Sequence, residues 1–164
     1  MRAVIQRVKQ ASVEILPENG TGEIRMRSPE TALMRSIEKG LVVLLGIEEA
    51  DESKDVDWLV QKIINLRIFA DQHDLMNLSV MDVEGDMLVI SQFTLFASTR
   101  KGNRPSFTRS AKPDHAIPLY EEFVKKLQQL LGKNIKTGEF GAHMQVHLIN
   151  DGPVTIMIDT KNRE

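Results

Sequence analysis

The sequence contains no cysteine, which excludes a disulfide framework, a thiolate nucleophile and any zinc site with cysteine ligands. It also lacks a long hydrophobic run, because the longest aliphatic stretch, residues 41–47, is far short of the roughly 20 residues that a membrane-spanning helix needs. The first ten residues carry Lys or Arg every few positions and have no apolar stretch of the kind found in signal peptides. These absences predict a soluble, cytoplasmic protein with no membrane partner.

The sequence motifs of common hydrolases and nucleotide enzymes are absent too. There is no G-x-S-x-G nucleophile elbow, no P-loop, no dinucleotide-binding glycine pattern and no H-E-x-x-H metal motif. His143 and His147 are four residues apart, but they lie in a predicted strand without the carboxylates that usually complete a metal site. We therefore expect no metal and no cofactor.

Length and composition suit one folded domain. The chain has 164 residues, of which 41% are hydrophobic and 27% charged, so it can bury an ordinary core without cross-links. We expect residues 1–164 to form a single domain. The net charge of -2 does not by itself indicate nucleic-acid binding, so such binding has to depend on local charge.

One segment does concentrate positive charge. Residues 87–113 contain no Asp or Glu but carry five basic side chains: Arg100, Lys101, Arg104, Arg109 and Lys112. Charge of one sign in a loop is compatible with plain solvation and also with contacts to phosphate groups. Composition alone does not decide between the two.

Hydrophobic periodicity predicts a mixed pattern of strands and helices without repeats. A helix is expected from a cap at Asp51 or Ser53 to about Asn65, and a second from Pro113 to Leu131, with Leu119, Phe123, Leu127, Leu130 and Leu131 facing the core. Residues 17–36 are expected to form a long hairpin connection. The predicted strands are residues 3–8, 11–16, 41–47, 66–69, 87–96, 135–139, 144–149 and 154–159.

Two polar clusters interrupt these apolar strands. Ser91, Gln92 and Thr94 lie in the strand 87–96, where alternation places Gln92 and Thr94 on one face and Ser91 and Phe93 on the other. A Ser or Thr nucleophile needs a neighbouring base, and none is identifiable, but buried polar groups need partners and a ligand is one. The second cluster, residues 150–155, contains Gly152-Pro153, which by itself predicts an ordinary turn.

Together these segments resemble one family, the bacterial and eukaryotic type of D-aminoacyl-tRNA deacylase. The resemblance covers nearly the whole chain, in family order. Its matching segments are MRAVIQRV at the start, GLVVLLGI at 40–47, DWLVQKIINLRIF at 57–69, SQFTLF at 91–96, TRKGNRPSF at 99–107, KTGEFGAHMQV at 136–146 and NDGPVT at 150–155. The departure is residues 17–36, where the family usually has a short turn and this chain carries a longer polar insertion.

The resemblance implies a three-layer β/β/α fold and a homodimer. It also implies hydrolysis of the ester between tRNA and a D-amino acid or glycine. In the family the Gly-Pro bond is cis and enters the pocket of the other subunit, so Gly152 and Pro153, with Asn150 beside them, would select the chirality of the substrate in trans. A fixed backbone rejects an L side chain without reading which D side chain is present, and glycine has no side chain to exclude.

The remaining site residues follow from the same resemblance. Ser91, Gln92, Phe93 and Thr94 would form the opposite wall and act as the catalytic residues, with hydrogen bonds to the terminal adenosine or the ester. Gly141 and Met144 would bind the terminal adenosine, and Arg100, Lys101 and Arg104 would contact tRNA phosphates. The family picture gives the vicinal ribose hydroxyl of the tRNA a part in catalysis. A second proposal makes Thr94 an acyl-accepting nucleophile. Two other functions stay open: a non-enzymatic nucleic-acid-binding module of the same fold, which the absence of a basic tail past the last predicted strand disfavours, and a hydrolase of small esters.

Overall fold

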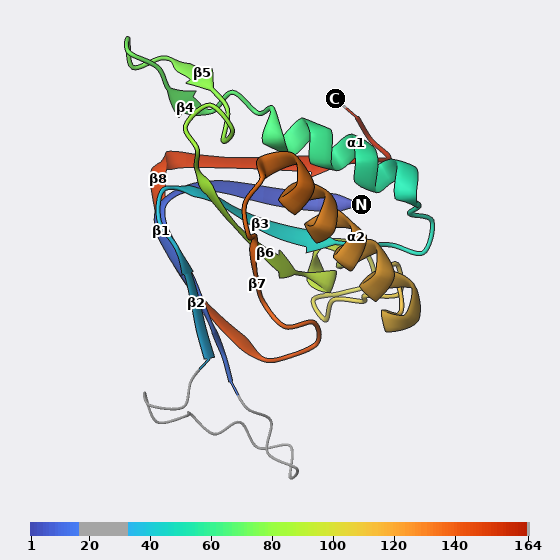
Figure 1. Cartoon of the computed structure of the whole chain (residues 1–164). Helices are drawn as coiled ribbons and strands as arrows, with labels where there is room; N and C mark the ends of the chain where they lie inside the picture. The colour runs from blue at the N-terminus through green and yellow to red at the C-terminus, as the bar shows by residue number, and fades with distance from the viewer. Residues whose placement is uncertain (17–32, 164) are drawn as a thin grey trace.

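Strand β1 (Arg2–Ile15) organises the sheet, because three other strands pair with it. In the computed structural model, which describes residues 1–16 and 33–163, β8 (Met144–Asp159) runs along one side of β1. The other side pairs with β3 (Gly40–Gly46) over its first half and with β2 (Leu33–Ile37) over its second half, all antiparallel. The two strands predicted at 3–8 and 11–16 are therefore one continuous strand that bends in the middle (Figure 1).

The sheet continues from β3 through β6 (Asp86–Ser91) to the short β7 (Lys136–Thr137), and both of these pairings are parallel. The strand order is β2-β1-β3-β6-β7, with β8 on the free side of β1. Since β1 bends, its second half, with β2 and the beginning of β8, turns away from the plane of β3 and β6 (Figure 1).

Strands β3 and β6 form the middle of three layers, because both of their faces are buried. Leu41, Val43 and Leu45 of β3 belong to the core under the helices, whereas Val42 belongs to a second core shared with Val13 of β1 and Ile37 of β2. The side chains of β6 also alternate between these two cores. This pattern explains why residues 41–47 are apolar without alternation, and it confirms the predicted mixed α/β fold.

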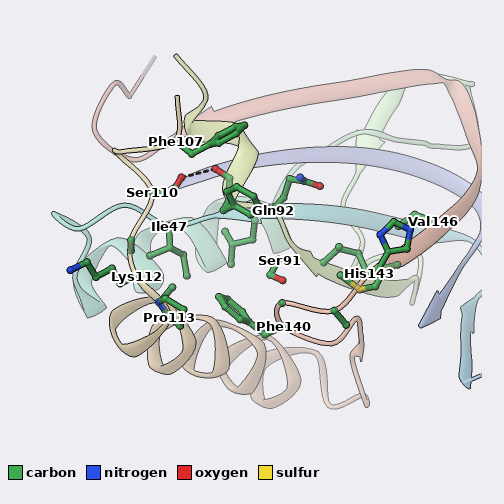
Figure 2. A pocket seen from close by; sticks show the side chains of 18 residues that line it. Ile47, Ser91, Gln92, Phe107, Ser110, Lys112, Pro113, Phe140, His143 and Val146 are labelled. Atoms are coloured by element: carbon green, nitrogen blue, oxygen red, sulfur yellow. Dashed lines mark hydrogen bonds between the residues drawn. The ribbon is translucent and has the colours of Figure 1, made fainter. Parts of the chain in front are cut away.

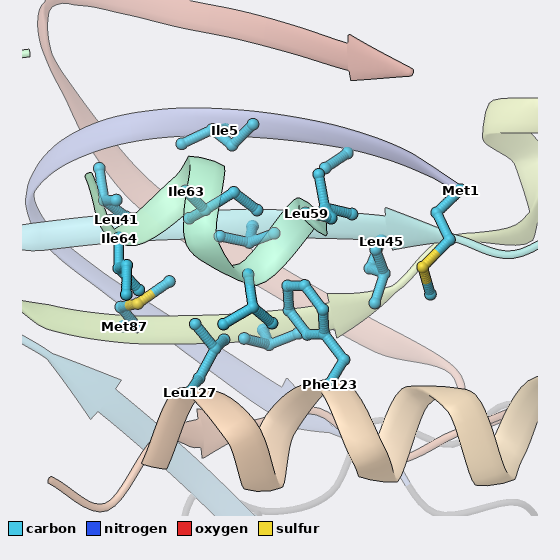
Figure 3. Close-up of a cluster of buried hydrophobic side chains, with 14 of the residues drawn as sticks. Met1, Ile5, Leu41, Leu45, Leu59, Ile63, Ile64, Met87, Phe123 and Leu127 are labelled. Carbon is cyan, nitrogen blue, oxygen red and sulfur yellow. The ribbon is translucent and has the colours of Figure 1, made fainter. Parts of the chain in front are cut away.

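Two helices cover one face of this middle layer (Figure 3). Helix α1 (Ser53–Ile64) buries Val56, Leu59, Val60, Ile63 and Ile64, as predicted. Its N-cap residue is Glu52, whereas the sequence predicted Asp51 or Ser53. Asp51 is not available as a cap, because it is buried and binds the amino group of Met1. Helix α2 (Pro113–Leu131) buries Phe123 and Leu127 against α1 and β3. Neither helix of the described ranges is long and apolar enough to cross a bilayer.

Leu130 departs from the predicted phase of α2. It is 43% exposed, whereas Leu119, Phe123 and Leu127 are buried and Leu131 is partly buried. The helix ends at Gly132 in the left-handed conformation, with φ of 62°, so Leu130 lies in its last turn. The apolar spacing of this turn therefore predicts one more buried residue than the structure has.

The bounds of three predicted segments differ from those in the structure. Residues 33–36 were expected to belong to the hairpin connection but form most of β2, where they gain a ladder with β1; the rest of the insertion, residues 17–32, lies outside the described residues. The predicted strand 66–69 is instead Phe69–Ala70 (β4), and it pairs with Met76–Leu78 (β5) in a small hairpin. The strand predicted at 135–139 is reduced to the two residues of β7.

Strand β8 replaces the two predicted strands 144–149 and 154–159. Gln6 pairs with Thr155 and Val8 with Asn150, so the four residues 151–154 stand opposite the single residue Arg7. The continuous partner β1 keeps both halves in one ladder, and the extra residues bulge out of it. The turn predicted at Gly152-Pro153 is therefore a bulge within a strand.

The helix-facing core should dominate the stability of the protein. Phe123 is fully buried between α1, β3 and α2, so Phe123→Ala should lower the free energy of unfolding by about 3–5 kcal/mol through lost burial and a residual cavity. The matched control is Leu130→Ala on the exposed side of the same helix, which should cost about 1 kcal/mol or less. Urea unfolding followed by circular dichroism measures both, and equal losses would contradict this description of the core.

Candidate active site

A cavity of about 550 Å³ opens beside the carboxyl ends of β3 and β6. Its walls come from four places: these strand ends, the segment after β6, the residues leading into α2, and the segment before β8 (Figure 2). The lining residues include Ile47, Ser91, Gln92, Phe93, Phe107, Lys112, Phe140, Gly141, His143 and Met144. Ligand sites of α/β sheets commonly lie at such strand ends, so this cavity is the candidate active site.

The segment after β6 turns away from the sheet as soon as it reaches the cavity. Phe93–Phe96 form a short 3-10 helix, η1, although the sequence predicted that the strand would continue. The turn packs against Gly46 at the end of β3, where an added Cβ would lie 2.9 Å from the Gln92 carbonyl oxygen and 3.1 Å from the Leu95 Cβ. The missing side chain of Gly46 therefore makes room for η1.

This turn separates residues that the sequence placed together. Ser91, Gln92 and Phe93 all line the cavity, but Thr94 does not. The predicted sharing of one strand face by Gln92 and Thr94 is wrong, since Thr94 lies in η1; its hydroxyl instead accepts a hydrogen bond from the Gln92 amide nitrogen. Thr94 is thus bonded to a residue of the cavity wall but is not itself part of the lining.

Aromatic rings form the side of the cavity nearest to the basic loop. Phe93 is 57% exposed, and its ring meets Phe107 edge to face with centroids 5.1 Å apart. The Ser110 hydroxyl donates to the Phe93 carbonyl at 2.8 Å (Figure 2), and the Ala111 amide donates to the Ile47 carbonyl at 2.9 Å. These bonds attach the end of the loop to the strand ends, and a partly exposed ring is left free to contact a ligand.

The predicted adenosine-binding residues form the opposite side. Gly141 and Met144 line the cavity together with Phe140, whose ring lies 6.1 Å from that of Tyr120. Burial raises the pKa of Tyr120, and its neutral hydroxyl donates to the Val89 carbonyl at 2.9 Å. Tyr120 therefore supports Phe140 from the helix side.

The Gly152-Pro153 bulge is not part of the cavity of its own chain. Both residues are exposed, and the peptide bond between them is cis, as the family resemblance implies. Arg7 fixes the base of the bulge, because its Nε donates to the Asp151 carbonyl at 3.0 Å and its Nη1 donates to the Ile68 carbonyl. Asn150 fixes the other side by accepting from the Val154 amide at 2.9 Å.

The three predicted phosphate contacts, Arg100, Lys101 and Arg104, are exposed near the cavity but outside its lining. They lie in a loop that is closed at its base by two backbone hydrogen bonds between Ser98 and Ser106, of 2.8 and 2.9 Å. Phe107 follows directly and contacts the cavity wall. The loop tip therefore presents its positive charge to solvent beside the cavity.

Several cavity residues were not predicted as site residues: Phe107, Ser110, Lys112, Phe140 and His143. They come from two separate segments, 107–112 and 140–143, which meet only because the loop before α2 and the segment before β8 fold over the same strand ends. His143 lines the cavity, whereas His147 lies in a separate groove beside β2. No group of three metal-ligating side chains occurs among the residues that the structure describes.

The described side chains that line the cavity are neutral or positively charged. Among its described lining residues there is no Asp or Glu, and the ionisable side chains are Lys112 and His143. The hydroxyl of Ser91 and the amide of Gln92 are the polar groups at the strand end (Figure 2). The site therefore offers hydrogen bonds and apolar walls, and it contains no carboxylate that could complete a catalytic triad.

Known proteins resemble the chain over its whole length. A curated protein of Flavobacterium johnsoniae named D-aminoacyl-tRNA deacylase is 57% identical, and one of Bacteroides fragilis with the same name is 56% identical, each over 100% of both chains. A solved structure described as c-Myc DNA Unwinding Element Binding Protein has a TM-score of 0.80 and 40% identity, covering 97% of this chain and 98% of its own.

A second solved structure, described as a probable eukaryotic D-amino acid tRNA deacylase, shares the fold with a TM-score of 0.74 at 15% identity, over 96% of this chain and 97% of its own. The profile of the family described as D-Tyr-tRNA(Tyr) deacylase matches residues 4–159. With this match and with relatives above half identity, the chain belongs to the D-Tyr-tRNA(Tyr) deacylase family.

Proposed function

We propose that this protein hydrolyses the ester bond of D-aminoacyl-tRNA and of mischarged glycyl-tRNA, and that it rejects L-aminoacyl-tRNA. The observation that carries the proposal is the meeting of Ser91, Gln92 and Phe93 with Gly141 and Met144 around one cavity, in a chain of this family. In the reaction, water adds to the ester carbonyl carbon and the bond from that carbon to the ribose oxygen breaks. The ribose oxygen takes up one proton of that water, and the amino acid leaves as a carboxylate with release of the other proton.

The composition of the cavity supports catalysis by positioning. An aminoacyl ester is already activated, so holding it against fixed hydrogen-bond donors and excluding other orientations can supply much of the acceleration. Gln92 carries donors at the end of β6, and no carboxylate of the described residues lines the cavity to act as a base. We assign the proton-relay role to the ribose hydroxyl next to the ester, which belongs to the substrate.

Chiral selection is assigned to Gly152 and Pro153 of a second copy of the chain. The bulge is exposed and rigidly held at its base by Arg7 and Asn150, yet it does not reach the cavity of its own subunit. A homodimer in which each bulge enters the partner's cavity would bring the two halves of the site together. Backbone atoms would then face the α-carbon of the substrate, where an L side chain has no room.

A second candidate function is non-enzymatic binding of nucleic acid. One relative, 40% identical, is described as a c-Myc DNA Unwinding Element Binding Protein, and the loop with Arg100, Lys101 and Arg104 offers exposed positive charge. Deacylation assays with D-tyrosyl-, L-tyrosyl- and glycyl-tRNA and with a free D-tyrosine ester separate the functions. Release of D-tyrosine and glycine, but not L-tyrosine, from tRNA supports the proposal, and binding without release supports the alternative. Hydrolysis of the free ester alone would indicate a small-ester hydrolase.

The role of Thr94 can be tested directly. Because Thr94 does not line the cavity and bonds Gln92, Thr94→Ala should keep at least about a tenth of the single-turnover rate on D-tyrosyl-tRNA, a loss of no more than about 1.4 kcal/mol of barrier stabilisation. Replacing the 2′-hydroxyl of the terminal ribose by hydrogen should slow the reaction about 100-fold or more, because it removes a reacting group. An inactive Thr94→Ala together with a trapped acyl-enzyme in the wild type would instead establish a nucleophilic threonine.

Mixing two inactive variants tests action in trans. Ser91→Leu fills the cavity, and Gly152→Val displaces the bulge, because a Cβ at Gly152 would lie 2.8 Å from both Arg7 Nη2 and Val154 Cγ2. Each variant alone should be inactive. Refolding them together at equal concentration should restore about a quarter of wild-type activity, because half of the dimers are mixed and each mixed dimer has one intact site. If Gly152 served the cavity of its own chain, no mixture would recover activity.

The basic loop should act on binding and not on chemistry. The triple change of Arg100, Lys101 and Arg104 to Gln should raise the Kd for tRNA and reduce the slope of log K against log salt by about one per lost phosphate contact. The matched control replaces three exposed lysines of the helices, Lys54, Lys62 and Lys125, by Gln. All three are outside the loop and the cavity lining. An unchanged salt slope in the triple variant would indicate that the loop is only solvated and does not contact tRNA phosphates.

A further inference from the structure

Arg35 of β2 connects two strands that are not neighbours in the sheet. Its Nη1 donates to the Thr137 carbonyl at 2.7 Å, to the Thr137 hydroxyl at 3.0 Å and to the Gly138 carbonyl at 3.1 Å. Strand β2 is at one end of the order β2-β1-β3-β6-β7, and Thr137 ends β7 at the other. One guanidinium group therefore joins the two edges of the curved sheet.

The peptide that Arg35 holds leads directly to the cavity wall. Gly138 is buried against Met144, because a Cβ at Gly138 would lie 2.4 Å from the Met144 sulfur and 3.1 Å from Ile90 Cδ1. The next amide, of Glu139, donates to that sulfur at 3.4 Å. Phe140 and Gly141 then line the cavity together with Met144. A shift of the Gly138 carbonyl would consequently move the side of the cavity assigned to the terminal adenosine.

Within residues 1–16 and 33–163, few other contacts fix this peptide. Strand β7 has only two paired positions with β6, at Lys136 and Thr137, followed by one hydrogen bond from the Gly138 amide to the Val89 carbonyl at 3.1 Å. The far end of the segment is fixed by the Leu16 amide, which donates to the His143 carbonyl at 3.0 Å. Between these two anchors the two N–H groups of Arg35 Nη1 are shared among three acceptors, and hydrogen bonds from a charged donor are stronger than neutral ones.

We infer that Arg35 is a positioning residue for substrate binding, which acts through Thr137 and Gly138 on the adenosine-binding segment from Gly138 to Met144. The inference rests on the proposed function for the identity of the ligand. It also connects that site with the strand that follows the insertion, since β2 begins at Leu33. Arg35 does not line the cavity, so its effect on the reaction is indirect.

The test compares Arg35→Met with a matched control. Methionine keeps an apolar stem of similar length but removes every donor. The control is Arg67→Met, because Arg67 also donates to a backbone carbonyl, that of Asn77 at 2.9 Å, but lies outside the cavity lining. Steady-state kcat and KM are measured on D-tyrosyl-tRNA, and the Kd for AMP, as a probe of the adenosine subsite, is measured by calorimetry.

Arg35→Met should raise KM about tenfold and the Kd for AMP by a similar factor, and it should leave kcat within about twofold, because adenosine contacts are made equally in the ground and transition states. Arg67→Met should leave all three values near those of the wild type. A general loss of folding would not produce this separation, since it lowers the active fraction and therefore the apparent kcat. A KM within twofold of wild type, or a raised KM with unchanged AMP affinity, would overturn the inference.

Two further arms keep the inference testable. If Arg35→Met does not fold, Thr137→Val removes one of the three acceptors in an isosteric side chain and should raise KM and the Kd for AMP about threefold; no increase would overturn the inference. AMP binding needs no turnover. If wild-type protein releases no D-tyrosine from tRNA, the proposed function fails, and the AMP affinities of the variants still decide the role of Arg35.

Discussion

The burial of β3 and β6 on both faces is the constraint on which the rest of the structure depends. Helices α1 and α2 cover one face, and the other face is covered by the second half of β1 with β2 and the first half of β8. To cover both faces with one sheet, β1 has to bend, and β8 has to follow it. The carboxyl ends of β3 and β6 then emerge between these two layers, where loops from both sides meet. The cavity lies at this point.

The residue pattern predicted the layers better than the connections. Uninterrupted apolar residues in 41–47 indicated a doubly buried strand, and helical spacing indicated the buried face of α1, because both signals depend on local periodicity. The continuity of β8 through Gly152-Pro153 depends on β1, which is distant in sequence and pairs with both halves. The turn into η1 depends on the space left by Gly46. Such pairings between remote segments leave no periodic signal.

The candidate site was predictable in part for the same reason. Ser91, Gln92, Phe93, Gly141 and Met144 carried the family resemblance, and they line one cavity. Phe107 and His143 lie in matching segments but were not assigned to the site, and Lys112 lies outside these segments. All three reach the cavity because hydrogen bonds fold the loop before α2 and the segment before β8 over the strand ends. The sequence did not identify Arg35, because it lies in a segment that resembles a polar loop. Its charged side chain is expected to face solvent unless β2 is known to pair with β1.

The bulge opposite Arg7 has a consequence for how β8 tolerates change. In a regular strand the side chains alternate, so adding or deleting one residue reverses which side chains face the core in everything that follows. Residues 151–154 do not pair with β1, and a length change there is absorbed without altering the inward or outward facing of Met144–Ile149 or of Thr155–Asp159. The choice of which side chains face inward in one half of β8 is thus independent of that choice in the other half. Strand pairing therefore does not restrict the length of the bulge, and its sequence is restricted instead by the bonds from Arg7 and Asn150 and by the role proposed for Gly152 and Pro153.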